Sequence, residues 1–263
     1  MFKFCSLYSG SSGNSLFVQT DNTKILVDAG ESAKKIETAL NSIDVNINDI
    51  DAVIVTHEHS DHIKGLSTIS KKFDIPIYAN KETWDAMPQV AEKTKNQNLF
   101  NVNEKFEIGD LKMVPFSIPH DAANPCGFNI FYNNQKISIA TDIGHMDKAI
   151  IKNLEGSSFV LLEANYDPNI LAYSRYPYSL KQRIAGPNGH LSNEAAGKTI
   201  SCLLNSGLQN VMLGHLSKES NFPELAYKTV IDELCANNFD ENKIKVGIAN
   251  RSNPSEILNL EVS

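Results

Sequence analysis

Apolar positions recur with two different periods along the chain, and these periods predict a succession of strands and helices. Short apolar runs between turn residues predict strands, while apolar residues three or four positions apart predict helices. The run Ala52–Val55 is apolar throughout, as is typical of a strand buried on both faces. In the first third we predict strands Phe2–Leu7, Ser15–Gln19, Lys24–Asp28, Ala52–Val55 and Ile75–Tyr78, with helices Ser32–Leu40 and Ile63–Ile69.

The middle of the chain is richer in strands, and the final third alternates strands and helices again. Asn133-Asn134 predicts a tight hairpin turn, and Gly207 predicts a helix end. We predict strands Lys105–Ile108, Leu111–Phe116, Cys126–Tyr132, Lys136–Ala140, Ser158–Glu163, Asn210–Leu213 and Lys243–Gly247, with helices Asn193–Asn205 and Pro223–Ala236. Two halves of this kind predict an α/β (α+β) fold, a single domain over residues 1–263, with two sheets face to face and helices outside.

Composition fits a globular protein and limits its partners. The 263 residues are 41% hydrophobic and 21% charged, so the chain can bury a core, and its net charge is −7. That charge argues against a protein that coats nucleic acid through a basic excess, so any phosphate binding must be local, as a metal site allows. No targeting segment is evident, and no apolar run approaches the roughly 20 residues of a membrane span.

The cysteines indicate a reducing compartment. Cys5, Cys126, Cys202 and Cys235 form no CxxC pair, so neither a zinc knuckle nor a thioredoxin motif is present. We therefore expect four reduced thiols in a cytoplasmic protein. The lack of a long apolar run predicts that this protein does not bind membranes.

The strongest chemical signal is a histidine-rich segment directly after the buried strand Ala52–Val55. Side chains alternate in an extended segment, so His57, His59 and Asp61 can point the same way, and His62 can swing toward the same place. Three of the seven histidines fall in this window, which makes a solvated polar loop a poor explanation. The segment therefore predicts a site that can hold more than one divalent cation.

Further donors follow other predicted strands. His120, Asp142 and His215 each lie after a strand end, where loops can converge on one edge. Two metals about 3.5–4 Å apart need a bridging oxygen ligand, and Asp142 is our candidate. A ligand set of histidines and carboxylates suits zinc, manganese or iron(II) without choosing among them.

These residues, in this order, resemble the metallo-β-lactamase superfamily over nearly the whole chain. The similarity runs through Ser9–Asn14, Asp28–Gly30, His57–His62, His120, Asp142 and His215. The resemblance implies a four-layer αββα sandwich with two metals at one edge of its sheets. It implies a water or hydroxide nucleophile between the metals, which Asp61 also orients. The implied ligands are His57, His59 and His120 for one metal, Asp61, His62 and His215 for the other, and Asp142 as the bridge.

Finer motifs are similar to the YycJ/WalJ-type group of bacterial proteins. They are residues 9–15, 119–122, 162–167, 189–194 and 214–218. This resemblance implies manganese-dependent 5′-to-3′ exonuclease activity on DNA and a link to cell-wall regulation through a two-component system. His190 matches a second histidine that phosphodiesterase relatives place near the substrate phosphate, where it can stabilise charge or protonate the leaving oxygen. The stretch from Asp142 to His215 is too short for the large inserted domain of ribonuclease J-like enzymes.

Several alternatives stay open at the site. His190 and His215 can exchange roles, and Glu163 either orients a ligand histidine or makes a structural hydrogen bond. His145 matches no ligand position, so we expect an exposed loop residue. The turn Ser9–Asn14 lacks the ending of a P-loop, and we expect a tight strand turn rather than a phosphate cradle.

A basic and aromatic stretch precedes His190. Its cations can grip a nucleic-acid backbone or be solvated, and its tyrosines can stack on bases or pack the loop. The residues are Arg175, Lys181 and Arg183, and Tyr173, Tyr176 and Tyr178.

Two functions compete with a phosphodiesterase. One is a carboxyl-ester or thioester hydrolase of the glyoxalase II kind, and the other is a non-enzymatic adaptor. His190 favours the phosphodiesterase, because a carbonyl hydrolase does not need it.

Overall fold

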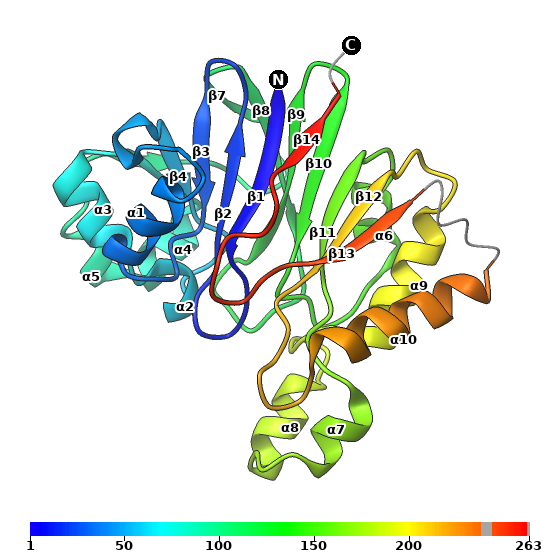
Figure 1. The fold of residues 1–263 in the computed structure, drawn as a ribbon. Coiled ribbons are helices and arrows are strands. Elements are labelled where there is room, and N and C mark those ends of the chain that lie inside the picture. The colour runs from blue at the N-terminus through cyan, green and yellow to red at the C-terminus, as the bar shows by residue number, and fades with distance from the viewer. Residues whose placement is uncertain (238–243, 262–263) are drawn as a thin grey trace. The chain divides into compact units, whose positions relative to one another are not determined.

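The computed structural model describes residues 1–237 and 244–261, and these fall into two compact units. Unit 1 comprises residues 1–117, 122–135 and 250 onward, and unit 2 comprises residues 118–121 and 136–249. The strands form two seven-stranded sheets (Figure 1). No helix in the described ranges combines the length and apolar character needed to cross a membrane.

Unit 1 contains the whole first sheet, whose strand order is β14-β1-β2-β3-β4-β5-β6. These strands are β1 (Phe2–Tyr8), β2 (Ser15–Gln19), β3 (Lys24–Val27), β4 (Ala52–Ile54), β5 (Ile77–Ala79), β6 (Gln97–Leu99) and β14 (Leu258–Leu260). The helical segments are α1 (Ala33–Asn41), η1 (Ile47–Asp49), α2 (Ser60–Ile63), α3 (Leu66–Phe73), α4 (Lys81–Ala86) and α5 (Pro88–Ala91). The antiparallel strands β7 (Phe106–Ile108), β8 (Leu111–Ser117) and β9 (Cys126–Tyr132) complete the unit.

The core of unit 1 explains why β4 ends where it does. Strands β3, β4 and β5 run parallel, and all three residues of β4 are buried, as its apolar run predicts. Helix α1 starts at the N-cap Ser32 and buries Ile36 and Leu40 in the same cluster as Val53 and Ile77. Polar residues can therefore begin only beyond Val55, at the carboxyl end of the strand.

Unit 2 is a four-stranded parallel arrangement with helices. Its strands are β10 (Gln135–Ala140), β11 (Phe159–Glu163), β12 (Asn210–Gly214) and β13 (Lys245–Ile248), in the order β13-β12-β11-β10. Its helices are α6 (Lys148–Leu154), α7 (Pro168–Tyr173), α8 (Tyr178–Ile184), α9 (Asn193–Leu203) and α10 (Pro223–Cys235). Because β10, β11 and β12 run parallel, the residues that follow or end them, Asp142, Glu163 and His215, lie at one edge.

Most predicted elements are confirmed within a few residues, but one helix is wrong. The predicted helix Ile63–Ile69 is divided into α2 and α3 at Gly65. The Gly65 N–H donates to Ala29 O, and a Cβ on Gly65 would lie 2.4 Å from Glu31 O. The chain therefore turns here so that its backbone can pack against the loop after β3.

Two further predictions concern the number of domains and the last strand. The single domain over residues 1–263 stays a prediction. The predicted strand Lys243–Gly247 begins outside the described residues, and its described part corresponds to β13.

Candidate metal centre

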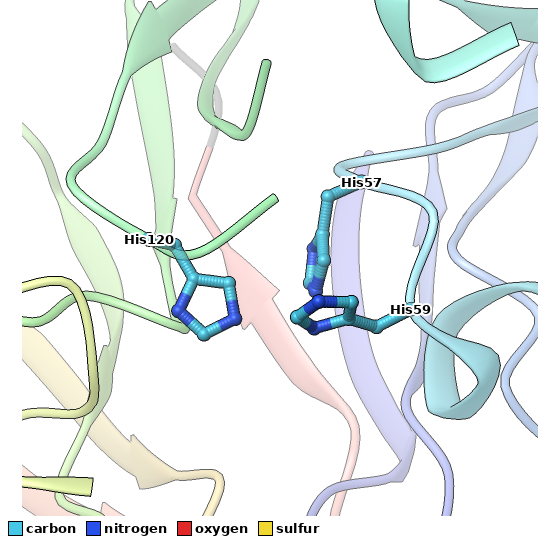
Figure 2. A group of neighbouring side chains, drawn as sticks. All are labelled: His57, His59 and His120. Carbon is cyan, nitrogen blue, oxygen red and sulfur yellow. The ribbon is translucent and has the colours of Figure 1, made fainter. Parts of the chain in front are cut away.

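Unit 1 carries the predicted histidine-rich segment on the loop and short helix after β4. His57 and His62 are fully buried, and His59 is half-buried. The ring centroid of His57 lies 4.6 Å from that of His59 and 4.1 Å from that of His62, and the rings of His57 and His59 lie next to each other on this loop (Figure 2). We call His57, His59, Asp61 and His62 the unit 1 cluster.

Asp28 fixes the orientation of His62. Its carboxylate accepts from His62 Nδ1 at 2.7 Å and from the Thr56 hydroxyl at 2.8 Å, and the Thr56 N–H donates to it at 2.8 Å. A carboxylate on one ring nitrogen fixes the tautomer and turns the other nitrogen outward, as in metal-ligating histidines. Asp28 belongs to the resemblance seen in the sequence, but no local pattern assigns it a role, because its partner His62 lies 34 residues away.

The turn between β1 and β2 supports Asp61. The backbone N–H of Asn14 donates to Asp61 O at 2.8 Å, and its side-chain amide lies 3.0 Å from His62 Nε2 and 3.4 Å from Asp61 Oδ2. Gly30 packs so closely that a Cβ would lie 1.6 Å from Asp61 O. The predicted tight strand turn is confirmed, and it also positions the unit 1 cluster.

Unit 2 brings together four other predicted residues, which we call the unit 2 cluster: His120, Asp142, His190 and His215. Asp142 Oδ1 lies 3.4 Å from His215 Nδ1, 3.7 Å from His190 Nδ1 and 3.8 Å from His120 Nε2. His120, Asp142 and His215 are buried, and His190 is half-buried. Asp142, His190 and His215 offer ligand atoms within 4.8 Å of one another, and Glu163 does so too.

Glu163 holds two of these histidines. Its Oε1 accepts from His215 Nδ1 at 2.7 Å and from His190 Nδ1 at 2.9 Å. Its Oε2 accepts the N–H groups of Ile143 at 2.8 Å and Leu191 at 3.1 Å. Because both oxygens are engaged, we assign Glu163 as an orienting group rather than a ligand. Of the two roles that the sequence left open, the contacts with both rings favour orientation of the histidines.

The charge of Glu163 is stabilised by its neighbours although the carboxylate is fully buried. Burial opposes the charged form, but the adjacent imidazoles of His190 and His215 outweigh it and hold the pKa of Glu163 below its usual range. A fully buried carboxylate that stays charged must be paired or hydrogen-bonded, and Glu163 is both.

His120 is oriented by the backbone beside His190. Its Nδ1 lies 3.1 Å from Gly189 O, which directs Nε2 toward Asp142. A Cβ on Gly189 would lie 2.1 Å from Arg183 O, so only glycine fits there. His145 is an exposed loop residue whose ring binds Pro187 O at 2.8 Å, as predicted.

Three residues of this region adopt a backbone conformation that is rare without glycine. The φ angles are 64° for Asp28, 59° for Asp142 and 55° for His215. Left-handed backbone at bulky residues costs of order 1–3 kcal/mol and tends to occur at functional sites. Each residue lies where the carboxyl end of a strand continues into a loop. The left-handed backbone conformation there sets the direction of its side chain.

The donors present fit divalent metal. Both clusters combine imidazoles with carboxylates and contain no thiolate, which suits zinc, manganese or iron(II). His62, His120, His190 and His215 each have Nδ1 engaged by a carboxylate or carbonyl. Such contacts fix the orientation of each ring, and at His62 the Asn14 amide also lies 3.0 Å from Nε2.

Comparison with known families agrees with this chemistry. The family described as "Beta-lactamase superfamily domain" matches residues 23–215. The chain therefore belongs to the β-lactamase superfamily, whose metal-dependent members gave the resemblance seen in the sequence. Its fold is an α/β sandwich of the metallo-β-lactamase type, and the histidine and aspartate clusters support binding of divalent metal.

Two curated relatives are similar over most of the chain. It is 39% identical over 233 residues to exodeoxyribonuclease YycJ of Bacillus anthracis, covering 88% of each chain. It is 38% identical over 237 residues to exodeoxyribonuclease WalJ of Streptococcus pneumoniae D39, covering 89% of this chain and 88% of that protein. The predicted similarity to the YycJ/WalJ-type group is confirmed.

A solved structure supports the fold. The metallo-β-lactamase fold protein YhfI of Bacillus subtilis superposes with a TM-score of 0.72, covering 97% of this chain and 100% of that one at 17% identity. At this identity the likeness shows the fold alone.

Proposed function

We propose that this protein is a metal-dependent phosphodiesterase that degrades DNA as a 5′-to-3′ exonuclease in the cytoplasm. The observation that carries the proposal is His190, held by Glu163 at 2.9 Å and lying 3.7 Å from Asp142. Relatives named exodeoxyribonucleases, similar over almost nine-tenths of the chain, support the same activity. The four free cysteines suit a reducing compartment.

Both clusters supply ligands in this proposal. Two divalent metals, manganese or zinc and with iron(II) as a further candidate, would stabilise charge on the phosphate and lower the pKa of the attacking water. We assign one metal to His57, His59 and His120, the other to Asp61, His62 and His215, and the bridging position to Asp142. Ligand chemistry and family membership support this assignment.

Asp61 and His190 then divide the proton transfers. Asp61, whose carboxylate lies beside the Asn14 amide, orients the water and takes its proton as the new bond to phosphorus forms. The bond from phosphorus to the 3′ oxygen of the terminal nucleotide breaks, and that oxygen needs a proton. His190 can supply it from Nε2, because Glu163 holds Nδ1 and thereby orients the ring.

The test uses purified protein, manganese and a linear DNA that carries a 5′ phosphate and a 3′ label. We expect mononucleotides from the 5′ end and a remaining strand that shortens while it keeps its label. A thioester substrate is assayed in parallel, because the same metal site could polarise a carbonyl. Hydrolysis of the thioester alone would contradict the proposal and favour the glyoxalase II-like alternative.

A further inference from the structure

Helices α7 and α8 form a small hairpin with its own core in unit 2 (Figure 1). Tyr166, Leu171 and Ile184 are buried together, with Tyr176 and Leu180 packed against them. We call residues 168–185 the α7–α8 hairpin. This core holds the two helices of the hairpin against each other.

The hairpin stabilises its own ends. The side chain of Asp167 accepts the N–H groups of Asn169 and Ile170, both at 2.9 Å, at the start of α7. Lys181 on α8 donates from Nζ to Ala172 O at 2.7 Å near the end of α7. The two helices are therefore joined by a direct polar contact as well as by packing.

The tyrosines that the sequence grouped together have different environments. Tyr176 packs against the hairpin core, whereas Tyr173 is 91% exposed and Tyr178 is 74% exposed. Among the described residues, these are the two most exposed large apolar side chains. Both rings are therefore available to stack on an unpaired base.

Residues 168–193, which include the α7–α8 hairpin, carry a positive net charge, opposite in sign to that of the whole chain. Residues 168–193 contain no Asp or Glu, although the chain carries a net charge of −7. Arg183 binds the Asp121 carboxylate, with Nη2 3.0 Å from Oδ1, so this cation serves the fold. Arg175 forms no ion pair with any residue in the described ranges, which leaves it able to bind an anion.

A cavity on the hairpin shares one lining residue, Tyr166, with a second cavity that His190 borders. It measures about 440 Å³ and is lined by Tyr166, Tyr178 and Lys181, among others. The second cavity, of about 330 Å³, is lined by Tyr166, His190 and Lys198, among others. Tyr166 thus borders both cavities, and its carbonyl accepts the N–H of Asn193 at 3.0 Å. A strand lying on the hairpin could continue along Tyr166 to His190.

We propose that the α7–α8 hairpin binds single-stranded DNA next to His190. Tyr178 and Tyr173 stack on unpaired bases, and Arg175 binds a phosphate of the same strand. Stacking requires an unpaired base, because the bases of a duplex already cover one another, and it tolerates any sequence. The inference rests on the proposed function for the identity of the strand, but the surface can be tested without any cleavage.

The first test measures binding by fluorescence anisotropy. Full-length protein is titrated against a labelled single-stranded oligonucleotide whose phosphorothioate linkages resist hydrolysis. Tyr178→Ala and Tyr173→Ala should each raise the Kd at least about fivefold. Tyr178→Phe should bind like the wild type, because the ring rather than the hydroxyl stacks. Tyr227→Ala is the matched control, since Tyr227 is an exposed tyrosine of α10.

The salt dependence of binding tests Arg175 separately. Each phosphate contact to a single strand contributes about 0.7 to the slope of log Kd against log salt. Arg175→Gln should lower that slope by about this amount and leave the thermal stability unchanged. An unchanged slope would show that Arg175 does not contact a phosphate of the bound strand.

The outcomes distinguish this surface from the proposed function. Hydrolysis of bis(p-nitrophenyl) phosphate by the wild type reports on the metal site separately from binding of the strand. Equal Kd values in the wild type and both tyrosine variants would overturn the surface, as would equally strong Tyr178-dependent binding of a blunt duplex. Tyr178-dependent binding by a wild type that hydrolyses neither DNA nor the reporter would support the surface and overturn the exonuclease.

Discussion

Asp28 accepts a hydrogen bond from His62 Nδ1 at 2.7 Å across 34 residues of sequence. The strain at Asp28, whose φ is 64°, is retained because this carboxylate also binds Thr56 through its N–H and its hydroxyl. These hydrogen bonds thus connect the end of β3 to the start of the histidine segment. One buried carboxylate therefore fixes the orientation of the His62 ring.

Replacing Asp28 tests this orientation. Asn tolerates a positive φ, so Asp28→Asn should keep the backbone but lose the charged partner of His62. We expect metal affinity to fall about 10- to 100-fold, measured by calorimetric titration with manganese and by metal content. Asp85→Asn, which breaks only the exposed pair with Lys81, is the control. Equal affinity in the two variants would refute the role of Asp28.

Glu163→Gln tests the carboxylate shared by His190 and His215. Glutamine keeps the shape of the side chain but offers only one oxygen acceptor, so either the two imidazoles or the two backbone N–H groups lose their acceptor. We expect weaker metal binding together with a lower kcat. Combining Glu163→Gln with His190→Ala should cost less than the sum of the single changes, because the two residues act through one contact. Additive losses in kcat would argue against that coupling.

Gly30→Ala tests the packing that supports Asp61. The new Cβ would lie 1.6 Å from Asp61 O, which is backbone and has to shift. Overpacking of this kind costs about 1–3 kcal/mol or more, so the midpoint of urea unfolding should fall. Gly247→Ala is the matched control, because its nearest contact is an ordinary 3.9 Å. Equal midpoints for the two variants would contradict the close approach.

The cysteines give a prediction about reactivity and pH. Burial raises the pKa of Cys5 to about 11 and that of Cys126 well above its usual value, so both stay protonated as the pH rises through 8. Cys202 and Cys235 are exposed. Because the thiolate is the nucleophile, Ellman's reagent at pH 8 should titrate Cys202 and Cys235 in the folded protein and all four thiols after unfolding. Rapid reaction of Cys5 in the folded state would contradict its burial.

Local patterns predicted the histidines and aspartates of the two clusters better than they predicted the groups that orient them. The histidine segment was visible because its donors lie within a few residues of one another, directly after an apolar strand. Asp28 and Asn14 acquire their roles through partners distant in the sequence, and no local period reveals such a partner. Glu163 remained ambiguous for the same reason, until its contacts with His190 and His215 were seen.

The missed elements have a related cause. Helices α4 to α8 are each seven residues or shorter, so they contain too few turns for a hydrophobic period to appear. The basic and aromatic stretch was noticed for its composition. Only the structure separated the packed Tyr176 and the paired Arg183 from the exposed Tyr173 and Tyr178.

The most direct test of the account compares His190→Ala with His145→Ala under manganese. We predict that His190→Ala keeps the metal content of the wild type while kcat on 5′-phosphorylated linear DNA, whose 3′-oxygen leaving group needs a proton, falls about 10²- to 10⁴-fold, the usual contribution of a positioned acid or base. His145→Ala, which alters an exposed loop histidine, should retain the wild-type rate. Full activity of His190→Ala with its metals bound would contradict the role assigned to His190.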